Sequence, residues 1–165
     1  MTILTHEEVK QKIIRLAYQM LEEYSDEAEI FVFGINNNGT LLKEKLLNEL
    51  KKINPSIKFH SHQISLNPAH PTDHQIKTDI PLESLENKNL LIIDDVASTG
   101  RTLYYAAAHF NKILPRSIKI GVLVNRMHKS FPIEVNFMGR SLATTIHDDI
   151  QVDLKGNKNW SATLE

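Results

Sequence analysis

Hydrophobic side chains follow first a helical and then a strand-like pattern in the first third of the chain. Apolar residues recur every three or four positions over residues 9–21, directly after a Thr-His-Glu-Glu segment at 5–8 that has the form of a capping box. We therefore expect a first helix that ends near residue 23 and precedes any strand. The apolar run 30–33 predicts a strand, and leucines at helical spacing over residues 41–50 predict a second helix.

Short apolar runs predict the strands of the rest of the chain. Residues 57–66 alternate between apolar and polar side chains, whereas the unbroken run 90–93 is typical of a strand that is buried on both faces of a parallel sheet. A helix is expected over residues 99–111. Further strands are expected at 118–124, 135–138 and 150–154, and the polar tail 155–165 is expected to fray apart from Trp160.

Strands alternate with helices along most of the chain. This order predicts an α/β fold, a mostly parallel sheet with helices on both faces, in a single domain that spans residues 1–165. In such folds the ligand lies beyond the carboxyl ends of the strands. The loops at Gly34, Asp94 and Asn125 are therefore expected to meet at one edge of the sheet.

A polar, proline-broken connection of about 20 residues precedes the buried strand at 90–93. Connections of this length are uncommon in compact domains unless they cover a site. Residues 57–86 are therefore interpreted as the second strand followed by a flexible hood or lid. An added hairpin, or a surface insertion with no part in the chemistry, is the alternative.

Composition and charge narrow the class of protein. Hydrophobic residues make up 41% of the chain and charged residues 24%, which is ordinary for a globular domain and argues against disorder. The formal net charge is −1, so no bulk attraction to nucleic acid or membrane is implied. The absence of cysteine excludes disulfides, thiolate nucleophiles and cysteine-ligated metal sites. Because no basic leader and no apolar run of membrane-spanning length is present, a cytoplasmic protein is expected.

Two carboxylates and a hydroxyl-rich turn follow the predicted buried strand. Asp94 and Asp95 stand at the strand end, and the turn that leads into the next helix is Ala97-Ser98-Thr99-Gly100-Arg101-Thr102. The first backbone amides of that helix, together with the Ser and Thr hydroxyls, are suited to a phosphate dianion. Carboxylates cannot share that phosphate, but they accept hydrogen bonds from vicinal hydroxyls. The combination predicts a sugar-phosphate site, with the two acids on the ribose diol.

Other interpretations of these motifs are weaker. An acidic pair at a strand end also occurs in receiver-type phosphoacceptor domains, but that interpretation leaves the Ser-Thr-Gly-Arg-Thr turn unexplained. Residues 34–39 outline half of a P-loop, yet Thr40 and Leu41 stand where a lysine and a hydroxyl are required. The four histidines between residues 60 and 74 lack a convincing carboxylate partner, so no metal site made by the protein alone is expected.

The segment from Asp94 to Thr102 resembles the D-D-x-x-x-T-G-x-T signature of the type I phosphoribosyltransferases, which binds phosphoribosyl pyrophosphate, and every fixed position is filled. The likeness continues along the chain. Residues 122–133 and 137–140 look like the V-D-R-G-H-R-E-L-P-I and V-G-K-N stretches of the bifunctional pyrimidine-operon attenuator and uracil phosphoribosyltransferase family. Among the type I enzymes, the chain resembles that family most.

This resemblance implies transfer of 5-phosphoribosyl from phosphoribosyl pyrophosphate to a nucleobase, with release of pyrophosphate. Uracil or another pyrimidine is the first expectation and a purine the second, with Mg²⁺ held mainly through the substrate. The subunits are expected to form a homodimer or a larger homo-oligomer. The implied residues are Asp94 and Asp95 for catalysis, Ala97, Ser98, Thr99, Gly100, Arg101 and Thr102 for the 5′-phosphate, Ile35, Asn36, Asn37, Asn38 and Gly39 for pyrophosphate, and Met138, Gly139 and Arg140 for the base.

Departures from the family pattern leave a second function open. The family's pyrophosphate loop reads G-I-x-T-R-G, whereas residues 34–39 read Gly-Ile-Asn-Asn-Asn-Gly and lack the arginine. Segment 65–70 also lacks an arginine, and Asn125 replaces an aspartate. The alternative is therefore a weakly catalytic or non-catalytic regulator of this fold that binds phosphoribosyl pyrophosphate or a nucleotide. RNA is a further partner of that alternative, although the lysines over 43–58 are interleaved with glutamates, as on a solvated helix face.

Overall fold

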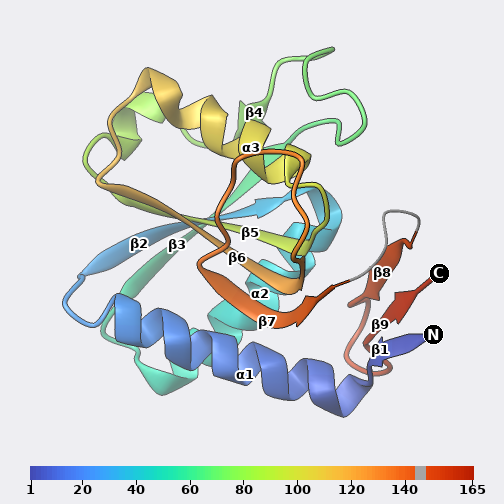
Figure 1. Ribbon diagram of the computed structural model, residues 1–165. Helices are drawn as coiled ribbons and strands as arrows, with labels where there is room; N and C mark the ends of the chain where they lie inside the picture. Colours follow the sequence, from blue (N-terminus) through green and yellow to red (C-terminus); the bar gives the residue numbers. More distant parts are fainter. Residues whose placement is uncertain (144–147) are drawn as a thin grey trace.

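Two β-sheets organise the chain, and the computed structural model describes residues 1–143 and 148–165 of it (Figure 1). In chain order the elements are β1 (Thr2–Leu4), α1 (His6–Glu23), β2 (Glu29–Ile35), α2 (Asn36–Ile53), β3 (Lys58–Ser65), β4 (Lys77–Thr78), a 3₁₀ helix (Leu82–Leu85), β5 (Asn89–Ala97), α3 (Arg101–Ala108), a second 3₁₀ helix (His109–Lys112), β6 (Ser117–Arg126), β7 (Phe137–Leu142), β8 (Ile150–Asp153) and β9 (Ser161–Leu164).

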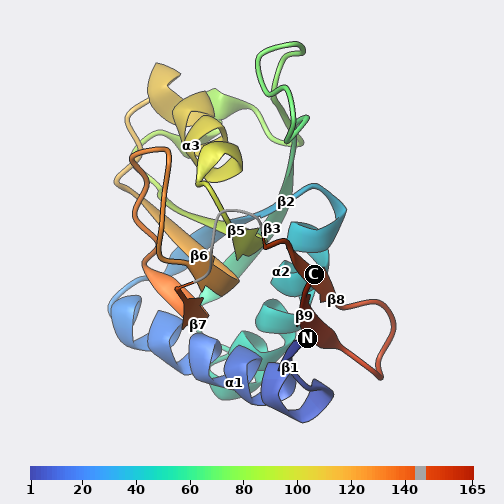
Figure 2. The same cartoon turned by 45° about the vertical axis from the view of Figure 1, so that its right-hand side comes forward.

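The larger sheet has the strand order β4-β3-β2-β5-β6-β7 within the described residues, and every pair except β3 with β4 is parallel. Side chains of α1 and α2 pack in the core on one face of this sheet, and those of α3 and the 3₁₀ helices pack in the core on the other face. Figure 2 shows α1 and α3 on opposite sides of the sheet. The predicted α/β architecture, a mostly parallel sheet with helices on both faces, is confirmed.

The first helix forms as its capping box predicts. The Glu8 amide donates to the Thr5 hydroxyl at 3.4 Å, and the Thr5 amide donates to the Glu8 carboxylate at 2.8 Å. Hydrogen bonding to Thr5 lowers the pKa of Glu8. The buried side chains of α1 lie along one stripe of the helix and join the core that also contains α2.

The two ends of the chain form a small antiparallel sheet in the order β1-β9-β8. Two sequence-based expectations are therefore wrong: a strand precedes α1, and the tail 155–165 does not fray. Leu4 and Ala162 are fully buried in this sheet. The strands have three and four residues and pair across the whole length of the sequence, so local hydrophobic periodicity does not reveal them. The strand expected at 150–154 belongs to this small sheet and not to the large one.

Two other boundaries differ from the expected ones. Helix α3 begins at Arg101 rather than near residue 99, because Gly100 has φ of +84°, a left-handed conformation outside the helical range. A 3₁₀ helix replaces its expected last turn. The strand expected at 135–138 is observed as β7, which continues to Leu142 because its residues pair with the end of β6.

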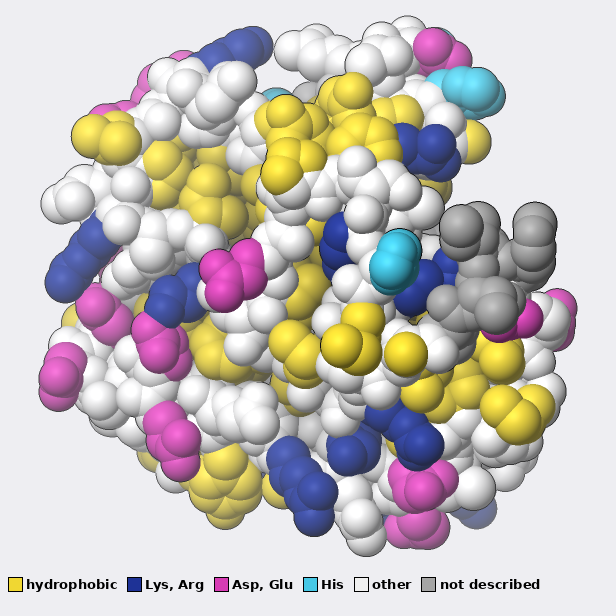
Figure 3. Space-filling model, in the orientation of Figure 1, with side chains coloured by type: hydrophobic (Ala, Val, Ile, Leu, Met, Phe, Trp, Pro, Cys, Tyr) yellow, Lys and Arg dark blue, Asp and Glu magenta, His cyan; other side chains and the backbone are white. Residues whose placement is uncertain are grey.

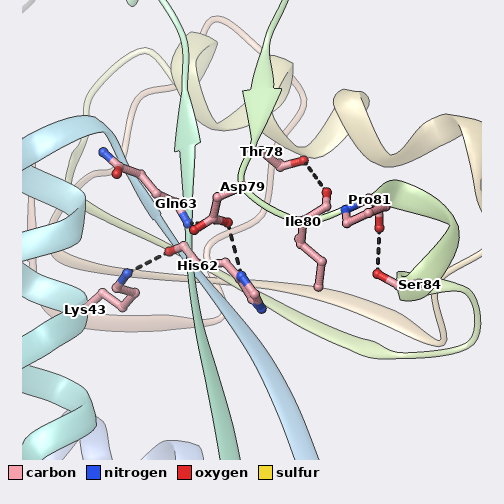
Figure 4. Close-up of polar contacts among 8 residues, drawn as sticks. All are labelled: Lys43, His62, Gln63, Thr78, Asp79, Ile80, Pro81 and Ser84. Atoms are coloured by element: carbon pink, nitrogen blue, oxygen red, sulfur yellow. Dashed lines mark hydrogen bonds and ion pairs between the residues drawn. The ribbon is translucent and has the colours of Figure 1, made fainter.

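The long connection after β3 is partly anchored. Strand β4 pairs with Ile64 and Ser65 to form a short hairpin, which was one of the alternatives left open. The Asp79 carboxylate beyond it accepts the Gln63 amide at 3.2 Å and contacts the His62 ring at 3.1 Å (Figure 4). On the other side of β3 the Lys43 ammonium donates to the His62 carbonyl at 2.7 Å. A lid that closes over the site stays a prediction.

None of the helices in the described part of the chain is both long and apolar enough to cross a membrane.

The small sheet should depend on the burial of Ala162. Ala162→Asp places a carboxylate at a fully buried position. We expect it to lower the free energy of unfolding by about 3 kcal/mol, because an uncompensated charge is costly to bury. Urea unfolding followed by circular dichroism measures the effect. The control is Thr163→Asp at a half-buried neighbour, which should cost less than about 1 kcal/mol because that carboxylate reaches water. Equal losses would mean that Ala162 does not anchor the sheet.

Candidate functional site

A cavity of about 410 Å³ opens at the carboxyl edge of the large sheet, where β2 and β5 end. Its position agrees with the switch-point rule for parallel sheets. Gly39 lets the first turn of α2 lie directly on the end of β5, because a Cβ there would stand 2.6 Å from the Ile93 carbonyl oxygen. The lining residues are Ile35, Asn36, Asn37, Asn38, Pro68, Asp94, Asp95, Val96 and Thr102.

The two carboxylates of this cavity have different environments. Asp94 is buried, and its Oδ1 accepts the Asp95 amide at 3.0 Å. Burial, and then the neighbouring Asp95 charge, raise the pKa of Asp94 well above its ordinary value. Asp95 is half-buried: its Oδ1 accepts the Val96 amide at 2.9 Å, and its Oδ2 accepts the side-chain amide of Asn38 at 3.0 Å. Asp95 is therefore the carboxylate more open to a ligand.

The hydroxyl-rich turn forms a second, smaller cavity of about 70 Å³ next to the first. It is lined by residues 96–103, which include all six of the positions predicted for a phosphate. Val96 and Thr102 line both cavities, so the carboxylates and the turn lie on directly adjoining cavities. Gly100 allows this turn to pack closely, because a Cβ there would stand 2.6 Å from the Ile133 side chain.

The loop over residues 35–39 also lies at this site. Asn36 is the first residue of α2 and has φ of +49°. Its side chain makes two hydrogen bonds to the backbone of Leu66, one as donor and one as acceptor. The Asn36 side-chain Nδ2 donates to the Leu66 carbonyl at 2.9 Å, and the Asn36 side-chain Oδ1 accepts the Leu66 backbone amide at 3.0 Å. These bonds tie the loop to the end of β3. The structure thus brings together the acids, the turn and the predicted pyrophosphate loop.

The residues predicted for the base lie elsewhere. Met138, Gly139 and Arg140 are on β7, and none of them lines either cavity described above. The Arg140 guanidinium donates to the Ile3 carbonyl at 3.1 Å, next to the small sheet. The Met138 sulfur lies 3.7 Å from the side-chain amide of Asn125. A role in base binding for these three residues stays a prediction.

Two contacts were missed from the sequence, one at the larger cavity and one beside Gly100 of the turn. Pro68 lines the larger cavity, and its carbonyl accepts the Arg101 Nε at 3.0 Å, so the long connection touches the phosphate turn. Lys129 donates to the Asn125 side chain at 2.6 Å and to the Arg126 carbonyl. Burial, and then the nearby Arg126, lower the pKa of Lys129. Pro68 lies in the proline-broken connection and Lys129 in the 122–133 stretch, and both segments were noticed in the sequence. The sequence of these segments does not specify which of their atoms face the site.

The backbone couples the turn to the β6–β7 connection. The Thr99 carbonyl accepts the amides of Ser130 and Phe131, at 2.9 and 3.1 Å. The Thr99 hydroxyl accepts the Arg101 amide at 3.3 Å and so caps the start of α3. Across residues 1–143 and 148–165, no group of three or more His, Cys, Asp or Glu side chains is placed to hold a metal ion.

Comparison with known proteins agrees with the fold and with the arrangement of the candidate site. A family model described as the phosphoribosyl transferase domain matches residues 1–154. The bifunctional protein PyrR of a Picosynechococcus species is 32% identical over 163 residues, which cover 93% of this chain and 89% of that protein. The bifunctional protein PyrR of Streptomyces coelicolor is 26% identical over 159 residues, which cover 92% of this chain and 82% of that protein.

Solved structures share the fold at low sequence identity. The hypoxanthine phosphoribosyltransferase of Trypanosoma cruzi superposes with a TM-score of 0.79 at 15% identity, over 99% of this chain and 94% of that one. A hypoxanthine-guanine phosphoribosyltransferase of Bacillus anthracis gives a TM-score of 0.72 at 18% identity, over 87% of this chain and 84% of that one. At these identities the likeness establishes the fold alone.

The buried Asp94 should make the chain less stable as it ionises. Because its pKa is raised above 3.8 in the folded state, the unfolded chain releases this proton at lower pH. The free energy of unfolding therefore falls as pH rises from near 3.8 through the folded-state pKa. Asp94→Asn keeps the acceptor for the Asp95 amide and cannot ionise. We expect this variant to be more stable than the parent at pH 7, by roughly 1–3 kcal/mol, with the difference shrinking toward pH 4.

Urea unfolding at a series of pH values measures this difference. Asp73→Asn, in the exposed connection, is the matched control, because there is no burial to relieve at that position. A constant difference between Asp94→Asn and the parent across the pH series would show that ionisation of Asp94 carries no penalty.

Proposed function

This chain belongs to the phosphoribosyl transferase domain family, and we propose that it transfers 5-phosphoribosyl from phosphoribosyl pyrophosphate to a nucleobase, releasing pyrophosphate. Uracil or another pyrimidine is the proposed acceptor, supported by the similarity to bifunctional PyrR proteins, with a purine second. The observation that carries the proposal is that the carboxylate cavity and the hydroxyl-rich turn adjoin each other, with Val96 and Thr102 on the border of both. One ligand can therefore place a phosphate in the turn and a ribose on the carboxylates.

The turn would hold the 5′-phosphate as an anchor remote from the reacting carbon. Its backbone amides at the start of α3 and the hydroxyls of Ser98 and Thr102 supply the donors. Binding energy gained there orients the sugar and is available to the transition state. The side chain of Arg101 is directed to the Pro68 carbonyl, so it steadies the connection beside the phosphate.

Asp94 and Asp95 would act on the ribose. When the bond from the sugar carbon to pyrophosphate breaks, the electron pair leaves on pyrophosphate and the carbon gains positive charge. A nitrogen lone pair of the base then forms the new bond, and the proton carried by that nitrogen passes to water. Asp95 is the less buried member of the pair, so its carboxylate faces the ribose hydroxyls and compensates this charge. Asp94 lies behind it and holds the Asp95 backbone in place through their 3.0 Å hydrogen bond.

The donor set fits a magnesium ion that is shared with the substrate. Mg²⁺ prefers hard oxygen ligands and commonly takes one or two carboxylates together with substrate phosphates. Asp94 and Asp95 provide such oxygens on the cavity wall, and would hold the ion together with the diphosphate. When bound, the ion supplies neutralising charge for the leaving group. The backbone amides over residues 36–38, at the N-terminal end of α2, would supply donors to the same group.

A second function is favoured by one specific observation. None of the described residues that line the larger cavity is a lysine or an arginine. A pyrophosphate there would lack a direct protein cation, which favours a regulator that binds phosphoribosyl pyrophosphate or a nucleotide with little turnover. RNA as its partner gains no support from the face in Figure 3, where acidic and basic side chains are interspersed over α1.

A transfer assay decides between the two functions. The protein is incubated with labelled phosphoribosyl pyrophosphate, Mg²⁺ and one of uracil, hypoxanthine, guanine, adenine, xanthine or orotate. We expect conversion of uracil above the other five bases. Rapid conversion of any one base excludes the regulator without turnover. If none of the six bases is converted but calorimetry shows that phosphoribosyl pyrophosphate binds, the result supports the regulator and overturns the proposed transferase activity.

The role of the turn in phosphate binding can be tested without a nucleobase. Thr102→Val removes one hydroxyl and keeps the shape of the side chain. We expect the affinity for ribose 5-phosphate, measured by calorimetry, to fall about tenfold, because hydrogen bonds to charged groups are typically worth about 1.5–3 kcal/mol. Thr78→Val is the matched control, since the Thr78 hydroxyl bonds to the Ile80 carbonyl away from both cavities. If Thr102→Val binds as tightly as the parent, the hydroxyl does not touch the phosphate.

A further inference from the structure

Asn38 makes a contact that its predicted place in a pyrophosphate loop does not explain. Its side-chain amide donates to Oδ2 of Asp95 at 3.0 Å, across 57 residues of sequence. Both residues line the larger cavity, so the bond joins its two walls. Asn38 also lines a neighbouring polar cavity of about 290 Å³ that includes residues of β8 and β9. Its carboxamide thus forms part of the partition between the two spaces.

This bond fixes the rotation of the Asp95 carboxylate. The Val96 amide holds Oδ1 at 2.9 Å, while Asn38 holds Oδ2. Two donors on different oxygens favour this orientation of the carboxylate over others. An ionised carboxylate has about four acceptor positions. Each oxygen of Asp95 therefore keeps a free position for a ribose hydroxyl while its plane is held.

The neutral character of Asn38 matters for the charge of the site. A guanidinium here, as in the G-I-x-T-R-G pattern, would pair with Asp95 and cancel much of its negative charge. An amide orients the carboxylate and adds no net charge. The Asp95 charge therefore stays available to the positive carbon that forms during transfer.

The other asparagines of the loop are placed differently. The Asn36 side chain is engaged with the Leu66 backbone in both directions. Asn37 and Asn38 are both exposed and line the same cavity, but it is the Asn38 side chain that bonds to Asp95. From this arrangement we infer that the Asn38 side chain positions Asp95 and acts through it on the ribose, and that this side chain is not a direct contact for pyrophosphate. This inference rests on the proposed function, since it names how the same site holds the ribose.

Two fragments of the proposed substrate test the inference by calorimetry. Ribose 5-phosphate carries the diol and the 5′-phosphate, and inorganic pyrophosphate with Mg²⁺ represents the leaving group. Asn38→Ala should weaken ribose 5-phosphate about tenfold, the scale of one hydrogen bond to a charged group, and leave pyrophosphate unchanged. In the transfer assay, KM for phosphoribosyl pyrophosphate should rise by a similar factor, because the same ribose contact is weakened, and kcat should fall as well, because the oriented Asp95 charge also compensates the positive carbon. Weakened pyrophosphate with unchanged ribose 5-phosphate would overturn the inference.

A double-mutant cycle tests whether the effect passes through Asp95. In an Asp95→Ala background, Asn38→Ala should have no further effect on ribose 5-phosphate, because the carboxylate that it orients is gone. Asn37→Ala is the matched control and should combine additively with Asp95→Ala. Additive effects of Asn38→Ala and Asp95→Ala would overturn the inference. Asn38→Arg adds a charge test: it should not restore ribose 5-phosphate binding to the parent level, because the guanidinium neutralises Asp95.

The contact itself is measurable in the free protein. In the ¹⁵N-labelled chain, Asp95→Ala should shift the side-chain amide resonances of Asn38, and Asp73→Asn should not. Folding of each variant is checked by its backbone spectrum. If the parent binds neither fragment, the proposed function fails, while the amide shift still decides whether Asn38 holds Asp95. An unmoved Asn38 amide would refute the positioning role even if both fragments bind.

Discussion

The close approach of α2 to the carboxyl end of β5 determines the geometry of the site. Gly39 permits it, because any side chain there would enter the space of the Ile93 carbonyl and come within 3.3 Å of Asp94. With the helix in this position, the loop over residues 35–38 faces the acids across one cavity. The parallel pairing of β2 with β5 places the loop and the acids at the same edge of the sheet, since Gly34 is in register with Ile93. The site thus depends on a backbone contact as much as on its charged side chains.

The charge distribution at this edge of the sheet is unbalanced. Asp94 lies buried beside a second carboxylate, at a cost that the apolar layers on both faces of the sheet have to offset. Such a cost is common at functional sites, where charges are arranged for a ligand rather than for the stability of the fold. Neutral donors surround the acids: backbone amides hold one oxygen of each, and the Asn38 amide holds the remaining oxygen of Asp95.

The sequence predicted the architecture because its signals were long and local. The unbroken run 90–93 and the regular spacing over 9–21 each specify one element, and their alternation specifies the layers. The acids and the phosphate turn were found because they occupy nine consecutive positions. Strands β1 and β9 were missed because each is short and finds its partner at the other end of the chain. The Asn38–Asp95 bond and the Pro68–Arg101 bond were missed for a related reason: they join segments whose relative placement only the folded backbone defines.

The way in which the site is assembled bears on how such a chain can diverge. Residues 94–102 come from one strand, one turn and one helix start, so an insertion or deletion among them would displace every contact to the sugar phosphate together. The neighbouring polar cavity has a different origin, because its wall combines α2 with β8 and β9. The turn between those two strands contains Gly156 at φ of +64°, where an added Cβ would meet no atom within 4 Å. This φ favours glycine at position 156, but the length of the turn and its other residues can change while the sugar-phosphate half keeps its register. Descendants of one such domain can therefore change what they recognise beside a common ligand without rebuilding the fold.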